Sequence, residues 1–106
     1  MSTFAEFNPA DDFTPQAILE ACFERNEDAI LIDRNALPPE FFHLRTGMAG
    51  ELAQRLTLYG VRLACVVPDL SSQPARFIEY ARESNQGDRI RFFESRAEAE
   101  EWLKAE

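Results

Sequence analysis

The side chains best suited to chemistry lie in one stretch near the middle of the chain, residues 37–52 (Leu-Pro-Pro-Glu-Phe-Phe-His-Leu-Arg-Thr-Gly-Met-Ala-Gly-Glu-Leu). This stretch holds the chain's single histidine, His43. Histidine changes charge near neutral pH, so it can act as a general base when a nearby carboxylate orients its ring. One hypothesis is therefore a small enzyme whose catalytic residues are His43, Asp33 and Glu40. In the other interpretation His43 is partly buried, bonded to the backbone, and has no chemical role.

The same stretch could bind an anion without catalysing a reaction. The first turn of a helix that begins at Thr46 and Gly47 would have backbone N–H groups with no partner inside the helix, and these could bind an anion. Arg45 adds a positive charge beside them. Residues 47–50, Gly-Met-Ala-Gly, fall short of a glycine motif for phosphate, so no particular anion is indicated. We expect a small anionic ligand here or, in the enzyme hypothesis, an anionic substrate held by Arg34 or Arg45.

Two adjacent phenylalanines, Phe41 and Phe42, follow a pair of prolines at residues 38–39. Large apolar residues in such a connection either anchor a protein partner or cover the core beneath them. We expect one ring to be buried and the other to be partly exposed. A homodimer formed through these rings, or through an exposed edge strand, would also fit the sequence.

The remaining reactive side chains form no recognisable motif. Ser71 and Ser72 lack the nucleophile-elbow pattern and have no histidine at a suggestive spacing. Cys22 and Cys65 have no cysteine or histidine at metal-ligand spacing, so we expect no metal and no cofactor. Both cysteines stand in apolar runs, which predicts buried free thiols in a reducing compartment. We therefore expect a cytoplasmic protein.

The elements that must position these residues alternate between strands and helices. The predicted strands are residues 3–7, 29–32, 61–67 and 89–93, of which the first and last lie nearer the edges of the sheet. The predicted helices are residues 15–25, a main helix from 46 to 59, residues 74–84, and a helix that follows the capping box at Ser95 and Glu98. This alternation predicts a mainly parallel sheet with right-handed crossovers. We expect a single α/β domain over residues 1–106, a sandwich of a four-stranded sheet and about four helices.

Sites in such a sheet lie at the carboxyl ends of the strands. Residues 33–35, 43–47, 68–72 and 94–95 should meet at that rim, and residues 83–87 should lie at the opposite one. The predicted ligand- or partner-binding residues are Asp33, Arg34, Phe41, Phe42, His43, Arg45, Thr46, Gly47 and Ser71.

The composition excludes several classes of protein. A chain of 106 residues with 45% hydrophobic and 28% charged residues is typical of one soluble domain. Its formal charge of −8 argues against binding to nucleic acid or to an anionic membrane surface, which both reward positive charge. No apolar run approaches the ~18 residues that a membrane span needs.

Residues 37–52 resemble the signature of a small bacterial family described only as a domain of unknown function. The same holds for residues 59–66 (Tyr-Gly-Val-Arg-Leu-Ala-Cys-Val) and for the pattern Phe-Ile-x-x-x-x-Glu-Ser-Asn-x-Gly at residues 77–87. The resemblance extends from about Thr3 to Leu103. Members commonly begin with an extra strand that forms a hairpin, and this segment is missing or reduced here. The resemblance gives a hint about the fold and implies no established activity.

A weaker likeness is to the STAS domain, the anti-sigma-factor antagonist. In that domain a buried strand ends in aspartate, and a loop leads to Asp-Ser-Ser-Gly at a helix start. Here Asp33 is similar to the strand end, and Thr46 and Gly47 are similar to the second serine and the glycine. Arg45 takes the place of the phosphorylated serine, so the resemblance does not imply a phosphorylation switch. It does imply an anion or partner site at that helix start.

The sequence thus leaves two functions open. It favours a non-catalytic regulatory or interaction module that binds a protein partner or a small anionic ligand at the carboxyl-end rim. The alternative is a small enzyme that uses His43 as general base on an anionic substrate. The module is favoured because no coherent catalytic set of side chains accompanies His43.

Overall fold

Four parallel strands form the sheet, and their spatial order β1-β2-β3-β4 is also their order along the chain. The structure, a computed structural model, describes residues 4–10 and 12–104. The strands are β1 (Ala5–Glu6), β2 (Ala29–Ile32), β3 (Arg62–Val66) and β4 (Ile90–Phe93). The predicted α/β class is confirmed, and β1 and β4 lie at the edges as expected.

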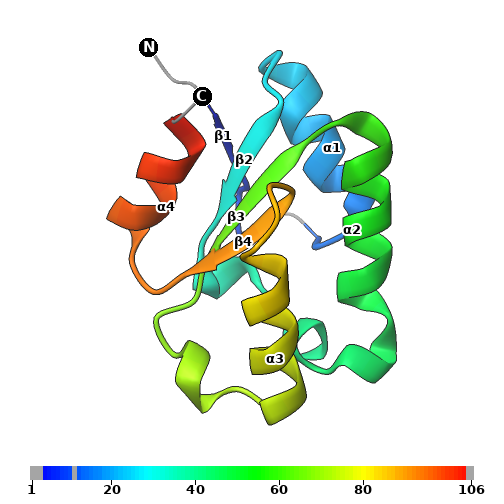
Figure 1. The fold of residues 1–106 in the computed structure, drawn as a ribbon. Coiled ribbons are helices and arrows are strands. Elements are labelled where there is room, and N and C mark those ends of the chain that lie inside the picture. Colours follow the sequence, from blue (N-terminus) through cyan, green and yellow to red (C-terminus); the bar gives the residue numbers. More distant parts are fainter. Residues whose placement is uncertain (1–3, 11, 105–106) are drawn as a thin grey trace.

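Three helices cover one face of this sheet and a fourth covers the other (Figure 1). The helices are α1 (Pro15–Glu24), α2 (Met48–Tyr59), α3 (Ala75–Ser84) and α4 (Arg96–Lys104). Because β-α-β connections are right-handed and the strand order never reverses, α1, α2 and α3 fall on the same face. Short 3₁₀ turns at Arg34–Ala36, Pro39–Phe42, Leu44–Thr46 and Leu70–Ser72 fill the connections after β2 and β3. Within residues 4–10 and 12–104, none of the helices combines the length and the apolar character that a membrane span requires.

The strands are buried on both sides because alternate side chains enter two separate cores. Ile30 and Ile32 of β2 pack in the larger core, under the three helices. Ala29 and Leu31 pack in the smaller core, against Leu103 of α4. The uninterrupted apolar run of β2 therefore reflects burial on two faces, as the sequence predicts.

Aromatic and cationic contacts hold α4 against the sheet. The guanidinium carbons of Arg62 and Arg91 lie 5.3 and 5.2 Å from the centre of the Trp102 ring. Arg62 also donates a hydrogen bond to the carbonyl oxygen of Leu103, at 3.1 Å. That carbonyl belongs to the last helical turn, where the helix itself leaves such groups unpaired.

The sequence signals for two helix starts are confirmed. The hydroxyl of Thr14 accepts a hydrogen bond from the N–H of Ala17 at 3.0 Å, and proline occupies the first helical position of α1. The hydroxyl of Ser95 accepts from the N–H of Glu98 at 3.3 Å and donates to its carboxylate at 3.1 Å. These local bonds fix where α1 and α4 begin.

Candidate functional site

A cavity of about 710 Å³ opens at the rim formed by the carboxyl ends of the strands. One wall consists of residues 42–45, from the 3₁₀ turns after β2. The other wall consists of residues 74–77, which begin α3 after β3. Since β2 and β3 are parallel neighbours, the segments that follow them meet at the same rim.

His43 lies exposed in this cavity. Its backbone is fixed, because its N–H donates to the carbonyl oxygen of Glu40 at 3.1 Å. Its ring forms no hydrogen bond or ion pair with the residues that the structure describes. The interpretation of His43 as a partly buried histidine bonded to the backbone is therefore wrong. The ring is accessible, on a backbone that is held in place.

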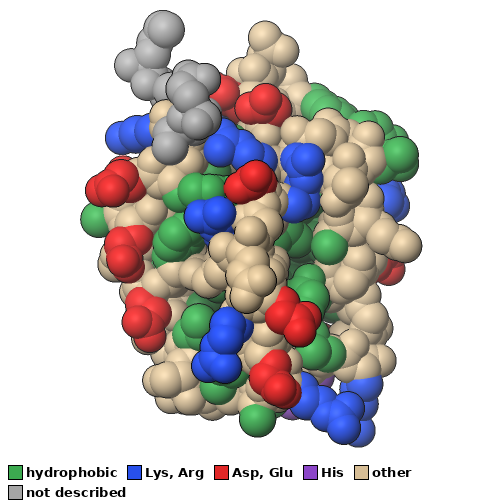
Figure 2. Space-filling model, in the orientation of Figure 1, with side chains coloured by type: hydrophobic (Ala, Val, Ile, Leu, Met, Phe, Trp, Pro, Cys, Tyr) green, Lys and Arg blue, Asp and Glu red, His purple; other side chains and the backbone are tan. Residues whose placement is uncertain are grey.

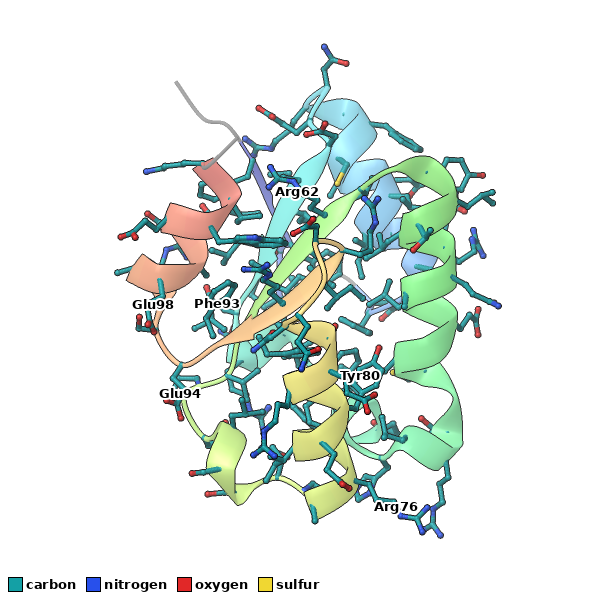
Figure 3. The ribbon with its side chains drawn as sticks, in the orientation of Figure 1. Arg62, Arg76, Tyr80, Phe93, Glu94 and Glu98 are labelled. Carbon is teal, nitrogen blue, oxygen red and sulfur yellow. The ribbon has the colours of Figure 1, made fainter. Side chains whose placement is uncertain are left out.

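Two arginines share the cavity with His43. Arg45 comes from the turn before α2 and Arg76 from the first turn of α3, and both are exposed. Neither forms an ion pair within the described part of the chain. Arg76 extends from the start of α3 at the lower end of the molecule (Figure 3). Basic side chains and histidine gather at this end of the surface (Figure 2).

The start of α3 adds backbone donors to the same wall. Pro74 precedes the helix, and no side chain forms a capping hydrogen bond there. The first N–H groups of an α-helix have no partner within the helix, and they carry its positive dipole end. The residues that bear them line the cavity, so its walls combine positive side chains with free donors.

The start of α2 differs from the prediction. Thr46 was the expected cap, whereas the structure places Gly47 at that position, with a left-handed φ of +79°. The Thr46 hydroxyl lies 3.0 Å from the carbonyl oxygen of Glu40 and 2.8 Å from that of His43. It also accepts from the N–H of Met48 at 3.3 Å. Thr46 therefore ties the two turns of the cavity wall together, and Gly47 supplies the backbone reversal into α2.

Phe41 and Phe42 are both buried, at 1% and 3% exposure, so the expectation of one partly exposed ring is wrong. The Phe41 ring packs edge-on against neighbouring rings at centroid distances of 5.5 Å to Phe13, 5.6 Å to Phe42 and 5.7 Å to Phe77. Edge-on packing of this kind adds to the free energy of burial. The two rings are the support beneath the cavity and offer no anchor to a partner.

Asp33 belongs to a different cluster from His43. Its carboxylate accepts a hydrogen bond from Arg96 at 3.2 Å. Arg96 also bonds Glu6, and it bonds Glu100 at 2.6 Å. These bonds to Glu6 and Glu100 raise the pKa of Arg96 above its ordinary value. The enzyme hypothesis assigns two carboxylates to His43, those of Asp33 and Glu40. Asp33 is engaged with Arg96, and within the described residues the exposed carboxylate of Glu40 forms no hydrogen bond or ion pair with the His43 ring.

Arg34 fastens the loop after β2 to the loop after β3. Its Nε donates to a carboxylate oxygen of Asp69 at 3.0 Å. Its guanidinium carbon lies 4.7 Å from the centre of the Phe42 ring. The side-chain amide of Gln73 donates to the other carboxylate oxygen of Asp69, also at 3.0 Å. These bonds position the chain that leads into the second wall of the cavity.

Ser71 lies apart from the cavity of His43. It is exposed, and it lines a separate hollow of about 460 Å³ beside β4 and the start of α4. Of the predicted binding residues, the structure brings Phe42, His43 and Arg45 together in one cavity wall. Asp33 pairs with Arg96, Arg34 pairs with Asp69, and Ser71 lines the separate hollow.

Arg76 is not among the residues predicted from the sequence. Pro74 is the signal that could have found it, because a proline after β3 marks a helix that begins at the carboxyl-end rim. Among the described residues, no group of three or more His, Cys, Asp or Glu side chains is placed to hold a metal ion.

The comparisons with known proteins identify a family. Neither a search of curated proteins nor a search of solved structures gave a match. A family model described as "Domain of unknown function (DUF4180)" matches residues 8–103, which include both walls of the cavity and all four helices except the end of α4. The chain therefore belongs to the DUF4180 family.

Proposed function

We propose that this protein is a non-catalytic regulatory module that binds a small anionic ligand in the cavity between residues 42–45 and 74–77. The observation that carries the proposal is the meeting of His43, Arg45 and Arg76 in one cavity. The chain as a whole has a formal charge of −8, so most of its surface repels an anion. An anion should therefore be attracted to the cavity, where the positive side chains of Arg45 and Arg76 lie close together.

The chemistry of the two walls suits a phosphate or carboxylate group. Arginine presents a planar fork of donors that matches both groups, and Arg45 and Arg76 approach from opposite walls. The uncapped start of α3 adds backbone N–H groups and a positive dipole end. A cavity of about 710 Å³ is within the range of small-molecule sites, roughly 300–1,000 Å³.

The non-catalytic part of the proposal is supported by the surroundings of His43. No carboxylate from the described residues is paired with the His43 ring, so binding is supported better than turnover. Cys22 and Cys65 are buried free thiols, which suits a reducing compartment, and we place the protein in the cytoplasm. The resemblance to a bacterial family suits that location.

Anion titration of the purified protein tests the proposal. Inorganic phosphate and a phosphomonoester such as glycerol phosphate would be titrated and followed through amide resonances of residues 43–47 and 75–78. The double variant Arg45→Gln/Arg76→Gln should weaken anion binding at least tenfold, because it removes both guanidinium groups from the cavity. The matched control is Arg82→Gln, on an exposed arginine of α3 that does not line the cavity. Equal affinity of the wild type and the double variant would disprove the assignment.

A native mass spectrum of protein purified from its own source would search for the physiological ligand. We expect a bound small anion that is retained in the wild type and lost from the double variant. An adduct that persists in the double variant would place the ligand outside this cavity.

A second candidate function keeps His43 as a general base on the bound anion. The observation that favours it is the accessible His43 ring inside the cavity. The variant His43→Gln separates the two functions. If the protein is a binding module, neither the wild type nor this variant turns over the bound anion. An enzyme loses turnover by roughly a hundredfold or more while retaining binding.

A further inference from the structure

A second surface lies at the opposite end of the molecule, where α1 and α2 terminate. The large hydrophobic side chains that are exposed among the described residues all occur there: Phe23 at 57%, Leu58 at 75% and Tyr59 at 52%. The rings of Phe23 and Tyr59 meet edge-on, with centroids 5.9 Å apart. Figure 2 shows hydrophobic side chains gathered along the upper end of α2. Single exposed hydrophobic residues are ordinary, whereas a contiguous group marks a contact surface.

The end of α1 holds its part of this surface rigidly. The N–H of Glu27 donates to the carbonyl oxygen of Cys22 at 2.9 Å, and the N–H of Asn26 donates to that of Phe23 at 3.1 Å. Asn26 takes a left-handed φ of +56°. This is the Schellman arrangement, in which asparagine substitutes for the usual glycine.

The end of α2 repeats the arrangement. The N–H of Val61 donates to the carbonyl oxygen of Leu56 at 2.9 Å, and the N–H of Gly60 donates to that of Thr57 at 3.2 Å. Gly60 has a φ of +69°. The exposed side chains next to both ends thus stand on a fixed backbone, which lowers the entropy lost on binding.

The charged side chains that line the hollow beside the two rings are negative. Phe23 and Tyr59 line a hollow of about 580 Å³ whose charged lining residues are Glu27 and Asp28. Neither carboxylate forms an ion pair within the residues that the structure describes. Burial raises the pKa of Cys22 to about 11, and the charges of Asp28 and Glu27 add to that rise. The carbonyl ends of α1 and α2 contribute further negative potential.

We propose that this surface binds a protein segment that presents an arginine or lysine next to an apolar side chain. The apolar side chain would cover Phe23, Leu58 and Tyr59. The cation would stack on an aromatic ring while it pairs with Glu27 or Asp28. Charge complementarity selects this partner over a second copy of the chain. A symmetric dimer through this surface would bring the carboxylates of both copies together in a protein of charge −8.

This surface is separate from the proposed anion cavity, because the two occupy opposite rims of the sheet. The anion cavity follows the carboxyl ends of the strands, whereas this surface precedes the amino ends of β2 and β3. Loss of one interaction should leave the other intact.

Two synthetic peptides of equal length provide the test. One alternates arginine with leucine, and the other has glutamate at every arginine position. Binding would be mapped on the full chain through its amide resonances. We expect the arginine peptide to shift resonances in residues 23–28 and 58–61, and the glutamate peptide to leave them unchanged. Absence of binding, or shifts confined to other surfaces, would overturn the proposal.

Single variants separate the ionic part of the contact, at Glu27, from the apolar part, at Phe23. Glu27→Gln and Phe23→Ser should each weaken binding of the arginine peptide at least tenfold. Glu79→Gln, on an exposed carboxylate of α3, should not change it. Equal losses in all three variants would indicate non-specific attraction to an acidic protein. A wild-type dimer that Phe23→Ser dissociates would show that a second copy occupies the surface, and would also overturn the proposal.

Discussion

The side-chain amide of Asn85 exchanges two hydrogen bonds with the backbone of Phe92. Its oxygen accepts from the N–H of Phe92 at 2.7 Å, and its nitrogen donates to the carbonyl oxygen of Phe92 at 3.1 Å. The hydroxyl of Ser84 donates to the carbonyl oxygen of Ile90 at 2.6 Å. Both partners lie in β4, an edge strand, so these side chains stand where a further strand would pair. A homodimer through an exposed edge strand would therefore have to displace them at β4.

Replacing Asn85 should expose this edge. We expect Asn85→Ala to lower the free energy of unfolding by about 1–3 kcal/mol, because two backbone groups lose their partner. Self-association should rise, since an open strand edge pairs with other chains. Urea unfolding and light scattering over a concentration series measure the two effects. Gln86→Ala, at the exposed neighbouring position, is the control and should change neither.

The burial of the Phe41 ring predicts a large loss of stability. Phe41→Ala should cost about 3–5 kcal/mol, because it leaves a cavity among the surrounding rings. Phe23→Ala, at a site with 57% exposure, should cost about 1 kcal/mol or less. Chemical denaturation of both variants makes the comparison. Similar losses at the two positions would contradict the assignment of Phe41 to the core.

Removing the guanidinium of Arg96 should leave Glu6, Asp33 and Glu100 without the cation that they share. We expect Arg96→Gln to reduce stability by about 1–2 kcal/mol at low ionic strength, because these contacts are partly exposed and repulsion between the carboxylates remains. Added salt screens that repulsion, so the difference from the wild type should shrink as salt rises. A deficit that is independent of salt would indicate lost packing of the arginine stem instead.

The raised pKa of Cys22 predicts a loss of stability at alkaline pH. In the unfolded chain this thiol ionises near its ordinary value of 9.0, whereas in the folded protein it stays protonated up to about 11. Below pH 9 both states hold the proton, and the stabilising contribution is fully present. Between pH 9 and 11 the unfolded state releases the proton first, so stability falls as pH rises.

Cys22→Ala tests this assignment by removing part of that alkaline slope. Denaturant unfolding at a series of pH values between 8 and about 11 measures it, and the ordinary thiol value sets the lower limit. Cys65 is also buried, and burial raises its pKa, so the double variant with Cys65→Ala should flatten the slope further. Unchanged slopes in both variants would assign the alkaline loss to other groups.

The fold could be predicted from local pattern because each element carries its own signal. The apolar run of β2, the Thr14-Pro15 start of α1 and the stop at Gly60 all gave boundaries close to those observed. The parallel pairing followed from the alternation of strands and helices. These features depend on neighbours in sequence, which is why the sequence contains them.

The site was less predictable because it depends on contacts between distant segments. Arg34 bonds Asp69, and Asp33 bonds Arg96, so two predicted binding residues serve to join loops. The exposure of Phe41 could not be predicted either, because its burial depends on Phe13 and Phe77 from other elements. The meeting of Arg45 with Arg76 likewise requires the β2–β3 register.

The position of α4 has a consequence for the synthesis of the chain. Ala29, Leu31 and Ala64 face α4, and synthesis reaches residues 96–104 only after all four strands have been made. On the ribosome, the emerging chain can therefore cover one side of its sheet with helices while the other side stays bare. Until α4 docks, that bare side is the part of the molecule most prone to aggregation, since exposed apolar surface on folding intermediates promotes it.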